Sequence, residues 1–154
     1  MRYPEYADDL QRIHASEVYG VALFDTAARL TRDAERRRKW LALKALEQQT
    51  LERYLAFMRE TRQPVREPRL WRQKGQVEGA ALGVLPWRVA MTLLRDGTQP
   101  FQATFLRLKR NASPEQSAFF EHVYAHEKAI EAFAIRELAG EDNSLQAVEA
   151  LLAR

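Results

Sequence analysis

The heptapeptide HASEVYG, residues 14–20, decides which fold the sequence suggests. Glu17, at its centre, lies at helical spacing from Ile13 and Val21 on one apolar stripe, so its carboxylate is expected to point into a core. An isolated buried carboxylate is costly unless a cation or a shared proton accompanies it. The stretch therefore predicts a helix that carries an acidic group in its buried face.

Two more glutamates occupy the same kind of position further along the chain. Glu47 continues the stripe of Leu43 and Thr50, and Glu127 lies four residues after Val123. Each acid falls near the middle of its expected helix, because a helix rises by ~1.5 Å per residue. We therefore expect all three carboxylates to meet at one level of the core, where a bound metal ion would offset their charge.

The spacing of apolar residues predicts an all-α fold, because no stretch alternates in the manner of a strand. A chain of 154 residues suits a single domain over 1–154. Two prolines within 61–76 indicate a long crossover that would let the next helix begin at the opposite end of a bundle. The expected helices are 6–31, 33–60, a third region over 77–110 broken at Pro86 and around 95–100, a fourth capped by Ser113 and ended by Gly140, and a short C-terminal helix capped by Ser144.

The composition excludes several classes of site. The chain has no cysteine, which rules out disulfides, thiol nucleophiles, iron–sulfur clusters and thiolate zinc sites. No apolar stretch approaches the roughly 20 residues of a membrane span, so we expect no transmembrane segment. The N-terminal residues lack the apolar run of a secretory signal, and a cytoplasmic location is therefore expected.

Charge is distributed unevenly along the chain. Residues 53–110 carry twelve basic and four acidic side chains, whereas 111–154 carry three and eight. The basic surplus could attract nucleic acid or anionic lipid, and a basic-surface binder is one alternative function. However, the arginines are scattered without a recognition motif. A solvated surface with no specific nucleic-acid partner is the preferred interpretation.

The segments around the three acids resemble those of the ferritin-like superfamily, and they are similar to its demethoxyubiquinone hydroxylase and rubrerythrin-like branches. The resemblance implies an up-down-down-up four-helix bundle with a long crossover after helix two. It also implies that Glu17, Glu47 and Glu127 bind metal. The segments that carry it are RIHASEVYG at 12–20, KALEQQTLERY at 44–54 and YAHEKAIEAF at 124–133.

The chain departs from the two-iron pattern of that superfamily. A Glu-x-x-His motif should occur on helices two and four, but Thr50 and Ile130 stand where the histidines are expected. The third region should add another glutamate, yet 97–114 contains no acid. We therefore expect a decayed or altered carboxylate site that holds one metal, iron or manganese, or none. Its candidate ligands are Glu17, Glu47, Glu127 and His126.

The histidines leave two interpretations open. His14 lies three residues before Glu17, and His122 lies one helical turn before His126. They could be surface or hydrogen-bonded residues, or they could approach a metal from a rotated helix. In the second case His126 is the nearest candidate, because it adjoins Glu127.

Two functions from different classes are compatible with this pattern. The first is a ferritin-like bundle protein with an altered metal site and no assigned catalytic residue. The alternative is a non-heme iron or manganese oxidase or hydroxylase that acts on a small apolar molecule. In either case a homodimer is expected, because the exposed parts of the third region offer an apolar surface.

Overall fold

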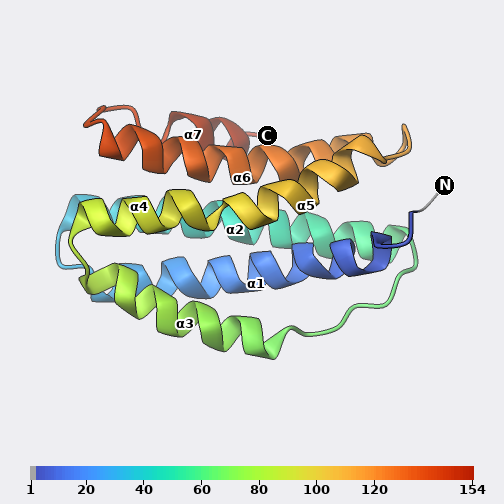
Figure 1. The fold of residues 1–154 in the computed structure, drawn as a ribbon, viewed down its shortest axis with the longest axis horizontal. Coiled ribbons are helices and arrows are strands. Elements are labelled where there is room, and N and C mark those ends of the chain that lie inside the picture. The colour runs from blue at the N-terminus through green and yellow to red at the C-terminus, as the bar shows by residue number, and fades with distance from the viewer. Residues whose placement is uncertain (1–2) are drawn as a thin grey trace.

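The computed structural model describes residues 3–154, which form helices and loops without a strand (Figure 1). The expected all-α class is therefore confirmed for this part of the chain. The helices are α1 Tyr6–Leu30, α2 Ala34–Glu60, α3 Arg69–Val84, α4 Trp87–Gly97, α5 Gln99–Arg110, α6 Ser117–Leu138 and α7 Gln146–Leu152.

The first two helices form a hairpin whose turn is fixed by side chains. The carboxylate of Asp33 accepts a hydrogen bond from the backbone N–H of Arg36 at 2.9 Å and caps α2. Thr31 lies in the turn, and its hydroxyl accepts a hydrogen bond of 3.0 Å from the indole of Trp40. The bounds expected from the sequence for these two helices are confirmed to within one residue.

α1 is the helix most enclosed by the others. It packs against α2, α3 and α5. Six consecutive residues, 13–18, are all buried, so this segment has no side that faces solvent. Glu17 lies within it and is 0% exposed.

The crossover after α2 is shorter than expected. It spans 61–68, because α3 already begins at Arg69, and the prediction of a crossover over 61–76 is wrong. Pro68 precedes the helix, and its carbonyl accepts the backbone N–H groups of Trp71 and Arg72 at 3.1 and 3.3 Å. A proline is tolerated at the start of a helix, because the N–H that it lacks would have no partner within the helix there.

α3 lies directly on the backbone of α1. Gly75, Gly79 and Gly83 recur every fourth residue and face α1. A Cβ added to Gly75 or Gly79 would lie 2.5 or 2.4 Å from the carbonyl oxygen of Tyr19 or Leu23. The two helices therefore lie so close together that only glycine fits at these positions.

Figure 1 shows how the longer helices are oriented. α1 and α6 run in one direction, and α2 and the α4–α5 pair run in the other, with α3 carrying the chain back after the crossover. The expected breaks at Pro86 and near Thr98 are confirmed, since α4 begins after Pro86 and α5 after Thr98. Gly140 follows the end of α6 with a φ of 73°, as expected for a helix stop.

Two predicted helix caps are wrong. Ser113 closes a turn instead, since its carbonyl accepts the backbone N–H of Gln116 at 3.0 Å, and α6 begins only at Ser117. Ser144 is buried, and α7 begins at Gln146 with Leu145 rather than Ser144 as its N-cap residue. In both cases the helix begins further along the chain than the predicted cap requires.

The outer face of α3 carries exposed apolar residues among charged and polar ones. Leu70, Val77 and Val84 are 78, 72 and 71% exposed and recur at seven-residue spacing. This is part of the surface on which a homodimer is expected, and the dimer stays a prediction. No helix among residues 3–154 is both long and apolar enough to cross a membrane.

Candidate metal centre

A polar layer divides the hydrophobic interior of the bundle into two clusters. One cluster gathers around Trp40 and Phe24, and the other around Tyr54 and Phe105. The acids and histidines predicted for the site lie between them. On α2 the first cluster ends at Leu46 and the buried residues of the second begin at Tyr54, with Glu47 and Thr50 in the interval. The buried residues of this layer are Glu17 on α1, Glu47 and Thr50 on α2, and His122, His126 and Glu127 on α6.

Three of the four predicted ligands converge. Glu17, Glu47 and His126 each offer one ligand atom, and these atoms all lie within 4.8 Å of one another. Nε2 of His126 is 3.2 Å from Oε2 of Glu47, and its Nδ1 is 3.6 Å from Oε2 of Glu17. Residues from α1, α2 and α6 thus meet at one point of the interior.

Several atoms of this group are buried without a hydrogen bond. Within the described part of the chain, no hydrogen-bond partner faces either oxygen of Glu17, Oε2 of Glu47 or Nε2 of His126. The close contact between His126 and Glu47 is not aligned for a hydrogen bond. Buried polar atoms are nearly always satisfied in proteins, so such a cluster fits a bound cation.

Glu127 lies beside the group rather than in it. Its side chain is buried, and its Oε1 accepts a hydrogen bond of 3.5 Å from the hydroxyl of Ser16 on α1. It is not among the three residues whose ligand atoms converge. Adjacent residues of a helix point about 100° apart, so only one of His126 and Glu127 can face the centre directly.

Two acids of this layer, Glu17 and Glu127, have raised pKa values. Burial raises the pKa of Glu17 well above its usual range, and the nearby carboxylate of Glu47 raises it further. Burial also raises the pKa of Glu127 to about 8. Burial opposes a charged His126, but Glu47 and Glu127 favour the charge, and its pKa is raised overall. Without a cation, the centre therefore holds protons at neutral pH.

The metal-free protein is expected to lose stability as pH rises from about 6.5 to about 9. Glu17 and Glu127 are ionised in the unfolded chain throughout this range but must give up protons in the folded chain, because burial raises both pKa values. The stability that protonated Glu17 and Glu127 contribute to the folded chain is therefore lost as pH rises through their folded-state pKa values. We expect a loss on the order of 2 kcal/mol, measured by urea unfolding at each pH.

A metal-bound sample is the control for this pH series. A divalent cation offsets the carboxylate charge, so its addition should flatten the dependence. A metal-free protein that is equally stable at both pH values would contradict the expected protonation of the acids.

The other two histidines occupy different places. His14 is buried against the ring of Tyr54, with ring centroids 5.0 Å apart, and its Nδ1 has no hydrogen-bond partner among the described residues. His122 is buried next to Thr50, and Nε2 of His122 lies 3.1 Å from the hydroxyl oxygen of Thr50. Both lie outside the three-residue group, and His122 is hydrogen-bonded, as one of the two interpretations of the sequence proposed.

Gly20 makes room for Glu47, a role that the sequence pattern did not indicate. A Cβ at this position would lie 2.2 Å from Cδ of Glu47. The glutamate carboxylate therefore rests against the backbone of α1, one turn after Glu17. The only signal in the sequence is the glycine that closes the stretch at 14–20, three residues after the acid.

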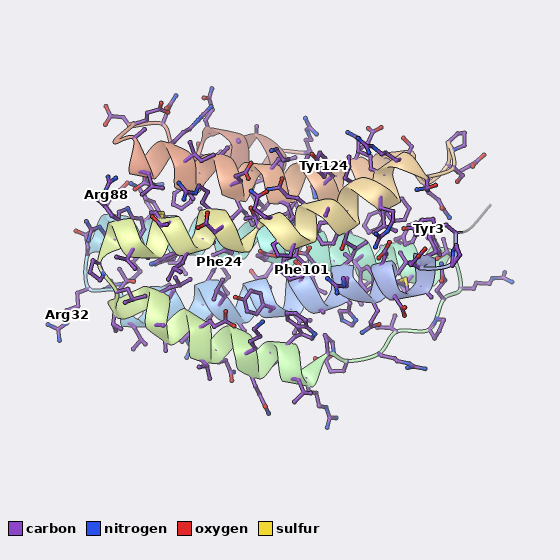
Figure 2. The ribbon with its side chains drawn as sticks, viewed as in Figure 1. Tyr3, Phe24, Arg32, Arg88, Phe101 and Tyr124 are labelled. Carbon is purple, nitrogen blue, oxygen red and sulfur yellow. The ribbon has the colours of Figure 1, made fainter. Side chains whose placement is uncertain are left out.

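A pocket of about 220 Å³ adjoins the centre. Most of its lining is apolar, and Phe24 and Phe101, both labelled in Figure 2, contribute to its wall. Glu47 and Glu127 reach it from the polar layer. A small apolar molecule in this pocket would thus lie next to carboxylates of the candidate metal centre.

The chain was compared with models of known protein families, with curated proteins and with solved structures, and none of the three comparisons gives a match.

Proposed function

We propose that this protein is a ferritin-like helical bundle with an altered carboxylate centre that binds one divalent metal ion through Glu17, Glu47 and His126. The observation that carries the proposal is the convergence of three ligand atoms within 4.8 Å, buried and largely without hydrogen bonds, between two hydrophobic clusters. Three protein ligands leave positions for water or a small molecule, a feature of functional rather than purely structural metal sites.

The arrangement of the helices supports the ferritin-like part of the proposal. With α3 left aside, α1, α2, α4–α5 and α6 follow an up-down-down-up order (Figure 1). His126 also compensates for a missing residue. Its Nδ1 lies 2.6 Å from the hydroxyl of Thr50, the position at which the family resemblance would put a histidine on α2. The imidazole of His126 on α6 therefore reaches the place where the resemblance would put a histidine on α2.

The donor set favours iron or manganese. Carboxylate oxygens suit hard cations such as Mn²⁺, and an imidazole adds affinity for Fe²⁺. Bound there, either metal would supply Lewis-acid or one-electron chemistry to a molecule in the adjacent pocket. The absence of cysteine leaves no thiolate to select a softer metal.

Metal stoichiometry tests the proposal. Protein purified without chelator should contain about one Fe or Mn per chain by elemental analysis, and Mn²⁺ titrated into the metal-free protein should bind at one site. Anomalous scattering should place the ion beside Glu17. Two tightly held metals per chain would contradict the altered site, and no Mn²⁺ or Fe²⁺ binding would contradict the whole proposal.

The pocket favours a second candidate, an oxidase or hydroxylase that acts on a small apolar molecule. Leu94 lines this pocket and is buried. Leu94→Trp should fill part of the space, so the iron-loaded variant should consume oxygen several-fold more slowly with an apolar substrate while its iron content is unchanged. If no apolar compound raises oxygen consumption above that of free iron, this candidate fails and the metal-binding proposal still stands.

A further inference from the structure

α3 turns its glycines toward the protein and its large aliphatic side chains toward solvent. Gly75 and Gly79 pack on the backbone of α1. Leu70, Val77 and Val84 are 78, 72 and 71% exposed, whereas no other large hydrophobic side chain of the described residues exceeds 51%. Exposure of this kind on one helix face marks a surface that binds a partner. We refer to these three aliphatic residues as the α3 seam.

The exposed apolar surface continues onto the helices beside α3. Leu30, which ends α1, is 46% exposed and adjoins Gly83, because a Cβ added to that glycine would lie 2.9 Å from Cβ of Leu30. Ala81 is exposed on α3 and lines the same pocket as Leu93 of α4, which is 51% exposed. The surface thus extends over three helices at the edge of the bundle where α3 lies (Figure 1). It is broader than the seam alone, as a specific protein–protein contact requires.

The seam is complementary to itself. Val77 lies seven residues from Leu70 and seven from Val84. A second copy related by a two-fold axis at Val77 would place its Val84 against Leu70 and its Leu70 against Val84. Seven-residue spacing is that of apolar side chains between two packed helices. The two-fold axis makes the helices antiparallel, and one surface then serves both copies.

The charges of α3 favour the same arrangement. Its cations, Arg69, Arg72 and Lys74, lie in the first half of the helix, and its one acid, Glu78, lies in the second half. In an antiparallel pair, the basic half of each copy faces the half that holds Glu78 and the negative end of the helix dipole. A parallel pair would place cations against cations. Within one chain, Lys74 and Glu78 are 3.9 Å apart, beyond hydrogen-bond distance, so Lys74 can turn to Glu78 of the second copy.

A membrane surface is the competing occupant, because cations beside apolar side chains attract anionic lipids. A helix that lies in a membrane surface buries a broad apolar face, whereas the seam of α3 is narrow and has exposed Gln73 beside it. Gln73 and Ala81 each lie four residues from Val77, so the antiparallel register sets the amide of Gln73 against a small side chain at the edge of the seam. On a membrane, the same amide would lie against hydrocarbon.

We propose that this protein is a homodimer in which the α3 seam of one copy packs antiparallel against the α3 seam of the other, centred on Val77. The proposal goes beyond the metal-binding function and does not depend on it, because no residue of the seam belongs to the candidate centre. A contact of this size is at the low end of stable interfaces, so a dissociation constant in the micromolar range is expected. Ala81 borders both the seam and the pocket, so the second copy would lie beside the pocket.

Disulfide cross-linking tests the arrangement, because the chain has no cysteine of its own. Val77→Cys should give a covalent dimer in high yield under mild oxidation. Leu70→Cys and Val84→Cys should each remain mostly monomeric alone, because the antiparallel register separates the two copies of each by ~21 Å along the helix. A mixture of these two variants should form the covalent dimer.

Ile135→Cys is the control for random collisions, because Ile135 is 47% exposed on α6, away from the seam. If Val77→Cys cross-links no better than this control, the proposed dimer is wrong. Efficient cross-linking by Leu70→Cys alone would show a parallel pair and overturn the proposed register.

Sedimentation equilibrium measures the association without a cross-link. Val77→Lys places two like charges at the two-fold axis and should weaken the dimer at least about tenfold, whereas Ile135→Lys should leave it unchanged. Circular dichroism should show the wild-type helix content in both variants, because both positions are exposed. A wild type that stays monomeric at every concentration, or a Val77→Lys protein that associates as the wild type does, would contradict the proposal.

A mixture of charge variants tests the pairing across the seam. Lys74→Glu and Glu78→Lys should each weaken self-association several-fold, because like charges then meet between the copies. An equal mixture of the two should recover dimers, since each variant supplies the charge that the other has lost. Failure of the mixture to recover dimers would overturn the antiparallel register.

Vesicles of phosphatidylcholine and phosphatidylserine test the competing occupant. The wild type should sediment with them no more than Val77→Gln does. A wild type that is monomeric in solution and binds these vesicles, with binding lost in Val77→Gln, would assign the seam to a lipid surface and overturn the inference.

Discussion

Replacing Glu17 with glutamine is expected to abolish tight metal binding and to stabilise the metal-free protein. Both oxygens of Glu17 are buried without a hydrogen bond, and burial raises its pKa well above the usual range. Glutamine has nearly the shape of the protonated acid but cannot ionise, and its amide is a poor ligand for Mn²⁺ or Fe²⁺. We expect at least ~100-fold weaker binding and, near pH 9, a gain on the order of 1–2 kcal/mol in the free energy of unfolding.

Calorimetric titration with Mn²⁺ and urea unfolding measure the two effects on the same sample. Glu52→Gln is the matched control, because Glu52 is exposed on α2 and lies outside the polar layer. It should change neither quantity by more than ~0.5 kcal/mol. A Glu17→Gln protein that still binds one Mn²⁺ with wild-type affinity would remove this residue from the centre.

Gly79→Leu is expected to destabilise the protein by about 3 kcal/mol or to detach α3 from α1. An added Cβ would lie 2.4 Å from the carbonyl oxygen of Leu23, and the atoms it meets belong to the backbone of α1. A backbone within an enclosed helix cannot rotate aside as a side chain can. Urea unfolding measures the loss, and hydrogen exchange of α3 amides detects detachment.

Gly97→Ala provides the matched glycine control. Within the described residues nothing lies within 4 Å of the position where its Cβ would be built, and Gly97 ends α4 without a left-handed backbone. Alanine favours the helix over glycine, so a neutral change or a gain of about 0.5–1 kcal/mol is expected. If Gly79→Leu is as stable as the wild type and α3 stays protected, the close approach of α3 to α1 is wrong.

The helices with apolar buried faces could be predicted from the sequence. α1 and α2 follow the 3.6-residue spacing of apolar side chains, and Pro86 and Gly140 mark the start of α4 and the end of α6 by backbone chemistry. α3 could not be predicted in this way, because its pattern is inverted. Its buried face is glycine, whereas Leu70 and Val77 face outward, so its first turns resembled a loop.

The candidate centre could be predicted only in part. Mid-helix positions on apolar stripes indicated three acids, of which Glu17 and Glu47 converge while Glu127 lies beside them. His126, which completes the group, was a candidate only as the neighbour of Glu127. The spacing could not decide whether His126 or Glu127 faces the others, because neighbouring residues differ by a rotation that depends on how α6 is turned. The role of Gly20 depends on a contact between helices, which no pattern within one helix contains.

The burial of six consecutive residues in α1 has a consequence for how this protein can change over evolution. A helix normally has a solvent-exposed face on which substitutions accumulate with little effect on stability. Residues 13–18 have no such side, so almost every replacement there alters the interior. Drift should therefore be slowest in this segment, and distant homologues should be recognisable by it when the rest of their chains has diverged.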